Sequence, residues 1–145
     1  MWSLAMVTKA GVPANKLVVG ISSYGRSFRM AEEGCTGPMC TFLGTREDSM
    51  AAKGECTDTA GYIADAEIRQ LQLQGSGQST YDADSDSDIF VYHGAEWVGW
   101  MDTDTKSRRV DLYQGLNFGG TSDWAIDLQY DHCGSTDQAE DVRCG

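Results

Sequence analysis

The sequence predicts an α/β protein in which two helix–strand units flank an inserted α+β lobe. The first observation is a nearly continuous apolar run in residues 16–24, which is typical of a strand covered on both faces. The second is a similar run at residues 122–129, and a helical pattern precedes each run. The third is the mixture of helical and alternating patterns between the two runs, which belongs to neither unit.

The first unit is predicted to begin with a helix at Trp2–Lys9, because Gly11 can end it and Pro13 prevents its continuation. A strand at Lys16–Tyr24 follows. Residues Arg29–Cys56 are rich in glycine and cysteine, so we expect them to be irregular.

Within the lobe, apolar spacing predicts a helix at Thr59–Leu73, followed by a loop at Gly75–Ser79 and a solvated acidic turn before residue 89. Residues 89–92 and 96–101 read as a hairpin. The remaining predicted elements are a helix at Lys106–Leu116, a strand at Ser122–Gln129 and a loose polar tail beyond Asp131.

The composition limits the classes of partner. The chain has 145 residues, a net charge of -11 and a pI near 4.3, and its largest basic cluster is Arg108-Arg109. This argues against nucleic acid and anionic membranes as partners, and no apolar run approaches the roughly 20 residues of a membrane-spanning helix. The net negative charge suits a secreted protein that acts on a neutral polymer.

Five cysteines favour an oxidising compartment. The first residues contain no recognisable signal peptide, a conflict that disappears if the chain is part of a longer protein. The cysteine and histidine spacings match no common zinc pattern, so neither a metal nor a cofactor is expected. One disulfide is expected among Cys35, Cys40 and Cys56, and we expect Cys56 to pair with one of the other two.

Polar and aromatic side chains stand where the two predicted strands end. Tyr24 and Arg26 end the first strand, and Trp124 and Asp127 lie in the second. In α/β barrels such strand ends form the active site. An aromatic face, a phenol and a guanidinium suit a sugar ring, although aromatic residues in strands more often belong to the core.

Several motifs resemble glycoside hydrolase family 18, and in particular fungal chitinases related to killer-toxin subunits: "KLVVGISSYGRSF", "GYIADAEI", "SDSDIFVY" and "LNFGGTSDWAIDLQ". The resemblance implies a partial (β/α)8 TIM barrel, reduced to its last two βα units, with an α+β chitinase insertion lobe. It divides the chain into a barrel helix and strand seven (1–28), the lobe (29–102), a barrel helix and strand eight (103–131) and a tail (132–145).

The resemblance also assigns substrate-binding residues. It places Trp124 under the sugar at the cleavage site, with Tyr24 and Arg26 lining the same subsite. Glu67 matches a family carboxylate that reaches a bound sugar, and Tyr62 is a further candidate. Of Trp97 and Trp100, at most one is expected to face sugar, with Trp97 the candidate and the core the expected place of the other.

The family's catalytic glutamate closes a D-x-x-D-x-D-x-E motif, and no glutamate of this sequence has that context. No catalytic residue is therefore expected in this chain. The function predicted is part of the chitin-binding cleft of a secreted chitinase, inactive in isolation, with chitin or N-acetylglucosamine oligomers as ligand. Two alternatives stay open. One is a lectin-like chitin-binding module, and the other is a half-barrel that assembles with a missing N-terminal half or a second copy.

Overall fold

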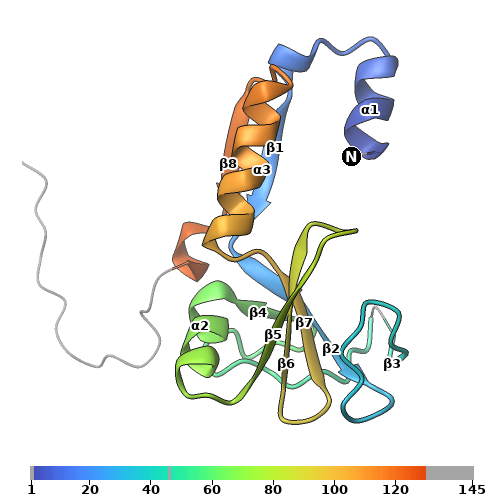
Figure 1. The fold of residues 1–145 in the computed structure, drawn as a ribbon, viewed down its shortest axis with the longest axis vertical. Coiled ribbons are helices and arrows are strands. Elements are labelled where there is room, and N and C mark those ends of the chain that lie inside the picture. Colours follow the sequence, from blue (N-terminus) through green and yellow to red (C-terminus); the bar gives the residue numbers. More distant parts are fainter. Residues whose placement is uncertain (1, 46, 130–145) are drawn as a thin grey trace, which may run out of the picture.

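The computed structural model describes residues 2–45 and 47–129, which form two sheets and three α-helices (Figure 1). The tail predicted at 132–145 lies outside the described residues. The elements are α1 (Trp2–Lys9), β1 (Val18–Ser22), β2 (Tyr24–Met30), β3 (Phe42–Leu43), β4 (Tyr62–Ala64), α2 (Asp65–Leu73), β5 (Gly77–Asp82), β6 (Ser87–Tyr92), β7 (Glu96–Trp100), α3 (Thr103–Gly115) and β8 (Gly120–Trp124). Short 3-10 turns occupy Ala14–Lys16 and Ile126–Leu128. Within this part of the chain, no helix combines the length and apolarity needed to cross a membrane.

The smaller sheet joins the two ends of the described chain. β1 and β8 pair in parallel, with a register that runs from Val18 opposite Gly120 to Ser22 opposite Trp124. The two strands that the family resemblance equates with barrel strands seven and eight are therefore neighbours. Helix α3 lies along the pair (Figure 1) and precedes β8 in the chain, as in a βα repeat.

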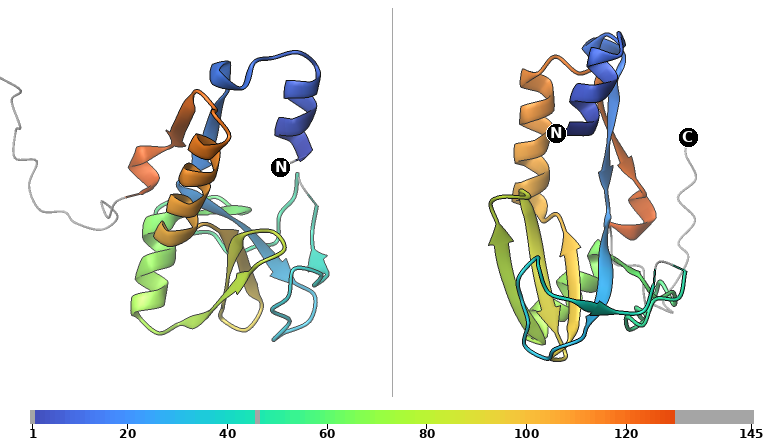
Figure 2. Two further views of the ribbon diagram at one scale, coloured as in Figure 1. Left: turned by 45° about the horizontal axis from the view of Figure 1, so that its top comes forward. Right: turned by 90° about the vertical axis from the view of Figure 1, so that its right-hand side faces the viewer.

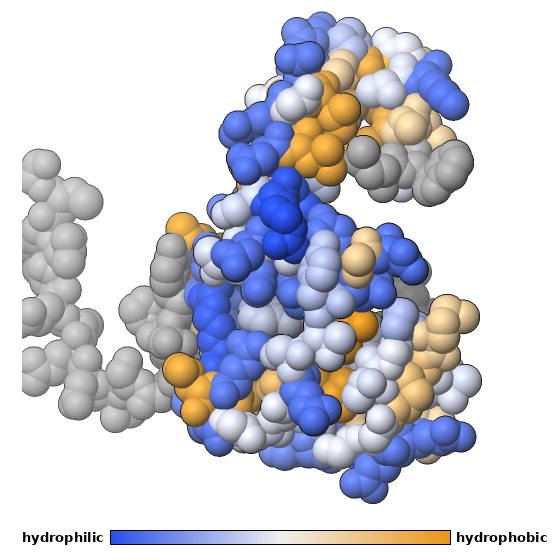
Figure 3. All heavy atoms as spheres, in the orientation of Figure 1, coloured by the Kyte–Doolittle hydropathy of each residue, from blue (hydrophilic) through white to orange (hydrophobic). Residues whose placement is uncertain are grey.

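The expectation that these strands are buried on both faces is wrong for the chain described here. Val18 is 62% exposed, and no residue of β8 is buried. The physical reason is that a pair of strands with one helix along it covers little of its own surface. Figure 3 shows the resulting apolar side chains around the strand pair and α1.

The larger sheet forms the lobe and contains the core. Its order is β3-β2-β7-β6-β5, with β4 also paired to β2. The predicted hairpin is confirmed as β6 and β7, which pair antiparallel. The buried cluster consists of Ile63, Ile68, Phe90, Tyr92, Val98 and Trp100.

Several element boundaries differ from the sequence prediction: the strand expected at 16–24 is divided into β1 and β2, and the helix expected at 106–116 begins at Thr103. The helix expected at 59–73 begins only at Asp65, because residues 62–64 pair with β2 as strand β4. The loop and acidic turn expected at 75–88 contain strand β5, which pairs with β6 along its whole length. The last strand ends at Trp124, because a 3-10 turn at Ile126–Leu128 follows it.

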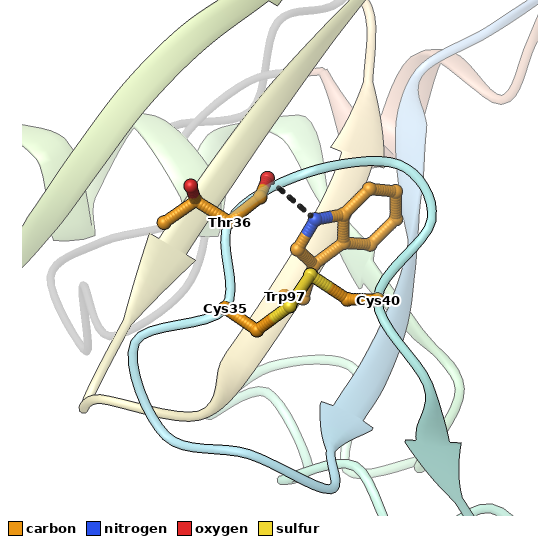
Figure 4. Close-up of a disulfide and its surroundings, with 4 residues drawn as sticks. All are labelled: Cys35, Thr36, Cys40 and Trp97. Atoms are coloured by element: carbon orange, nitrogen blue, oxygen red, sulfur yellow. Dashed lines mark hydrogen bonds between the residues drawn. A yellow bond between two sulfur atoms is a disulfide. The ribbon is translucent and has the colours of Figure 1, made fainter.

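One disulfide joins Cys35 to Cys40, with 5.9 Å between their Cα atoms (Figure 4). The expected disulfide within the irregular stretch is therefore confirmed, but the expected participation of Cys56 in it is wrong. A turn brings the two cysteines together, since the Cys40 N–H donates to the Gly37 carbonyl.

Candidate functional site

A single extended stretch of chain carries the candidate site from one sheet into the other. β1 and β2 are separated by one residue and run on in nearly the same direction (Figure 2, right). Side chains at the odd positions 21–27 are buried, whereas those at the even positions 22–28 are partly or fully exposed. Because successive side chains of a strand point to opposite faces, the even positions share one open face that spans both sheets.

Trp124 stands at the start of this open face. It lies opposite Ser22 in the parallel pair, so the two side chains share a face. The Ser23 N–H donates to the Trp124 carbonyl at 2.8 Å, which fixes the end of β8 beside the start of β2. With 71% of its surface exposed, Trp124 offers an indole platform to solvent.

Tyr24, Arg26 and Tyr62 form a connected group next along the face. The rings of Tyr24 and Tyr62 meet edge to face with their centroids 5.9 Å apart. The Arg26 guanidinium lies 5.3 Å from the centroid of the Tyr24 ring, and Arg26 is the cross-strand partner of Tyr62. Such a cation–π contact positions the guanidinium while leaving its N–H groups available to donate.

Together, Trp124, Tyr24, Arg26 and Tyr62 form what we call the aromatic face. Its members come from β8, β2 and β4, so both sheets contribute to it. An exposed apolar ring with two phenols and a guanidinium beside it can stack on a sugar and hydrogen-bond its hydroxyls. Four of the six residues predicted from the sequence are therefore brought together.

Trp97 lies on β7, which pairs with β2 in the larger sheet, and its ring is next to the disulfide loop (Figure 4). It is opposite Phe28 in the ladder, and the two ring centroids are 5.9 Å apart. Its indole N–H donates to the Thr36 carbonyl at 3.3 Å. Trp100, in contrast, is 5% exposed and belongs to the core, while a sugar contact of Trp97 stays a prediction.

Glu67 does not join the aromatic face. Its carboxylate is buried and accepts three backbone N–H groups: Cys56 at 2.6 Å, Thr57 at 3.3 Å and Ala64 at 3.0 Å. The first two hold the irregular segment before β4, and the third satisfies the first turn of α2. Because the Glu67 carboxylate accepts these three backbone hydrogen bonds, its role is to stabilise the lobe. Glu67 is therefore not among the proposed sugar contacts.

Glu96 also stabilises the lobe through a buried carboxylate, a role that the sequence analysis did not predict. It is 2% exposed, accepts from the Arg29 guanidinium at 2.6 Å and accepts the Ala52 N–H at 2.8 Å. Glu67 and Glu96 thus fix the segment before β4 at two places. The signal was present in the sequence, because alternation in the strand Glu96–Trp100 places Glu96 on the same inward face as Val98.

Helix α3 connects the strand pair to the lobe through two of its cations. The Lys106 ammonium lies 2.5 Å from the Asp65 carboxylate at the start of α2. Arg109 donates to the backbone carbonyl of Asp86 at 2.6 Å and to its carboxylate at 3.3 Å. Burial raises the pKa of the Asp65 carboxyl above its ordinary value, and the positive charge of Lys106 opposes that shift.

The described residues contain no group of three His, Cys, Asp or Glu side chains arranged to hold a metal ion. The side chains of the aromatic face offer ring stacking and hydrogen bonding.

A parallel strand pair with a helix along it, joined to an α+β lobe, is the arrangement of βα units in an α/β-barrel fold. The chain belongs to the glycosyl hydrolases family 18, whose family model matches residues 1–129. The fold class expected from the sequence, a partial barrel with an insertion lobe, is confirmed.

Fungal proteins are among the relatives of this chain. It is 54% identical over 129 residues to the probable chitinase LysM18 of Penicillium expansum, covering 88% of this chain but 9% of that protein. The secreted chitinase LysM12 of the same fungus is 51% identical over 130 residues, with the same two coverages. The killer toxin subunits alpha/beta of Kluyveromyces lactis are 32% identical over 126 residues, covering 85% of this chain and 10% of that protein.

Solved structures of family 18 proteins share the fold. A class V chitinase of Nicotiana tobaccum in complex with NAG4 superposes with a TM-score of 0.75 at 24% identity, covering 88% of this chain and 34% of that chain. Human YKL-39, described as a pseudo-chitinase with retained chitooligosaccharide binding properties, superposes with a TM-score of 0.74 at 27% identity, with coverages of 88% and 32%. The chain thus spans about a third of the length of these folds.

Proposed function

We propose that this chain supplies part of the chitin-binding cleft of a secreted family 18 chitinase, and that its aromatic face binds N-acetylglucosamine residues. The observation that carries the proposal is the open Trp124 ring at the end of β8, beside Tyr24, Arg26 and Tyr62. Trp124 stacks under a sugar ring, while the phenols and the guanidinium hydrogen-bond its hydroxyl and N-acetyl oxygens. Relatives named as chitinases, one of them as secreted, support this reading.

Binding without hydrolysis is the activity expected of the chain by itself. General acid catalysis contributes about 10²–10⁴-fold to such reactions, and the sequence has no glutamate in the family's catalytic motif. The relative YKL-39, a pseudo-chitinase with retained chitooligosaccharide binding, favours a lectin-like role as the second candidate function. Both candidates use the same aromatic face.

The remaining barrel would complete the strand pair. We propose the division into 1–28, 29–102 and 103–131 as barrel, lobe and barrel, with β2 (Tyr24–Met30) running from the first part into the sheet of the lobe. The exposure of Val18 and the open edges of a two-stranded sheet support pairing with further barrel strands, from a separate N-terminal half or from a second copy of the chain.

Calorimetric titration with the N-acetylglucosamine tetramer tests the proposal. Trp124→Ala is expected to weaken binding about tenfold, since it removes a stacking ring, while the fold persists because that ring is exposed. Leu73→Ala is the matched control, because Leu73 is 89% exposed and lies at the end of α2. Equal tetramer affinity of wild type and Trp124→Ala would refute the proposal. Turnover of a fluorogenic oligomer by the pure chain would refute the absence of hydrolysis.

A further inference from the structure

A pocket opens on the side of the larger sheet that faces away from the aromatic face. Ile63 lines it, and along β4 Ile63 follows Tyr62, whose side chain belongs to the aromatic face. Because successive strand residues point to opposite faces, the sheet separates this pocket from the aromatic face. It encloses ≈ 200 Å³ between α2, the β6–β7 turn and residues 52–55. We call it the lobe pocket, and its lining includes Ile63, Glu67, Leu71, Gln74, Tyr92 and His93.

The floor of the lobe pocket is fixed before any ligand arrives. Ile63 is buried in the core, and the Glu67 carboxylate is held by its three backbone hydrogen bonds. The Tyr92 ring stacks on Phe90 with the centroids 5.5 Å apart and meets the His93 ring edge to face at 5.1 Å. A site that needs no ordering lowers the entropy cost of binding.

The Glu67 carboxylate can accept one more hydrogen bond. Its two oxygens offer about four acceptor sites, and three backbone N–H groups occupy three of them. Lys53 is the one lysine or arginine among the described residues that line the pocket, and its ammonium pairs with Asp58 at 3.2 Å. None of the ion pairs among the described residues includes Glu67. A buried carboxylate without a cation favours a ligand that brings a positive charge.

The Tyr92 hydroxyl is a second polar group that protein atoms leave unsatisfied. Tyr92 is 4% exposed, and within residues 2–45 and 47–129 its hydroxyl forms no hydrogen bond. Burial and the charges of Glu96 and Glu67 raise the pKa of this phenol to about 12. The phenol is therefore neutral at pH 7, and its oxygen can accept a hydrogen bond from a ligand. A buried hydroxyl without a partner costs free energy that such a bond recovers.

A primary ammonium matches these groups, because it carries three N–H donors. One can donate to Glu67, one to Tyr92 and the third to the amide oxygen of Gln74 at the rim. Ile63 and Leu71 offer an apolar surface to a short hydrocarbon body. The volume of the pocket corresponds to about six or seven water molecules, so that body can have only a few carbon atoms.

We propose that the lobe pocket binds a small organic primary amine in its ammonium form, with the charged head between Glu67 and Tyr92. The short apolar body packs against Ile63 and Leu71. The net charge of -11 attracts such cations to the chain. Because the ammonium joins α2 to β6, an occupied pocket stabilises the lobe by mass action. This site goes beyond the proposed function and does not depend on it.

Titration of the whole chain with n-butylammonium chloride, followed by nuclear magnetic resonance of the aromatic side chains, tests the proposal. The ring signals of Tyr92 and His93 are expected to shift and to saturate, while the Trp124 indole signal does not move. n-Butanol is the matched neutral probe, because it keeps the apolar body and lacks the charge. It is expected to bind at least about tenfold more weakly, since hydrogen bonds from a charged donor are the stronger ones.

Two variants test the placement of the amine. Tyr92→Phe removes only the hydroxyl and is expected to weaken n-butylammonium binding about tenfold. Gln74→Trp guards against a folding defect in that core variant, because Gln74 is exposed at the rim and the added bulk closes the pocket. It is expected to abolish binding. Leu73→Trp is its matched control, since Leu73 is the exposed neighbour and does not line the pocket.

Three results would overturn the lobe pocket as an amine site. The first is equal affinity for n-butylammonium and n-butanol, because charge would then play no part. The second is an affinity that stays unchanged in either Tyr92→Phe or Gln74→Trp, and the third is the lack of any saturable shift at Tyr92 and His93. Trp124→Ala is expected to bind n-butylammonium as the wild type does. A loss in that variant would place the amine at the aromatic face instead, whereas failure of the amine site leaves tetramer binding untouched.

Discussion

Lys106 and Asp65 form a buried ion pair between the two halves of the molecule. The ammonium and carboxylate are 2.5 Å apart, and their side chains are only 12% and 0% exposed. Lys106 lies on α3, which packs on the strand pair carrying Trp124, whereas Asp65 follows β4, which carries Tyr62. The pair therefore helps to set the distance between residues that form opposite ends of the aromatic face.

The first prediction concerns pH. Burial raises the folded-state pKa of Asp65 above its ordinary 3.8, in spite of the nearby Lys106 and Arg69. The folded chain then holds a proton that the unfolded chain has released, so the contribution of Asp65 to the free energy of unfolding falls as the pH rises from 3.8 to the raised pKa. Urea titrations of wild type and Asp65→Asn between pH 3 and 7 give the difference in their free energies of unfolding, which measures the contribution of Asp65. A wild-type minus variant difference that grows with pH would contradict the prediction.

The second prediction concerns the ion pair itself. Lys106→Ala leaves a buried carboxylate without its cation and is expected to cost about 3–5 kcal/mol of unfolding free energy. The double variant Asp65→Asn/Lys106→Met removes both charges and is expected to cost less than Lys106→Ala alone. Chemical denaturation of the single and double variants gives both values. If the double variant is the less stable one, the pair contributes more by attraction than its burial costs.

The third prediction separates two roles for Glu67. Because its carboxylate accepts three backbone N–H groups, Glu67→Gln is expected to reduce the free energy of unfolding by about 2–4 kcal/mol. The affinity of the folded fraction for the tetramer should not change. A variant that keeps its stability but loses tetramer affinity would restore Glu67 as a sugar contact.

The fourth prediction concerns the disulfide. Peptide mapping without reduction should recover Cys35 linked to Cys40. Closing so short a loop is worth about 2 kcal/mol in the chain-entropy model, so Cys35→Ser/Cys40→Ser should destabilise the chain by that amount. It should also alter Trp97 fluorescence, since that indole donates to Thr36 within the loop. Recovery of a peptide linking Cys56 to either cysteine would contradict the structure.

Local patterns predicted much of this fold. The α1 helix, the β6–β7 hairpin and the pairing of the two barrel-type strands follow from apolar periodicity and topology. Strand β5 was missed because its residues 77–82 are polar and mostly exposed, so only pairing with the apolar β6 identifies them as a strand. The strand β4 was missed because residues 62–64 also fit the start of the helix that follows.

Tyr24, Arg26 and Trp124 of the aromatic face were predictable because they lie near predicted strand ends, whereas Tyr62 fell in a predicted helix and was named only through the family resemblance. The roles of Glu67, Glu96 and Asp65 were not predictable, because each acts on a partner far away in the sequence. Glu96 binds the Ala52 backbone across 44 positions, and Asp65 meets Lys106 across 41. No local pattern distinguishes such a buried carboxylate from a solvated one.

Mapping the N-acetylglucosamine tetramer onto the chain by nuclear magnetic resonance tests the central claim most directly. Each tryptophan has its own indole N–H, so the exposed Trp124 reports on the aromatic face and the buried Trp100 serves as an internal control. The account predicts large shifts for Trp124 and for the Tyr24 and Tyr62 rings, with the Trp100 signal unmoved. Shifts that leave Trp124, Tyr24 and Tyr62 unchanged, or no shifts at saturating tetramer, would contradict it.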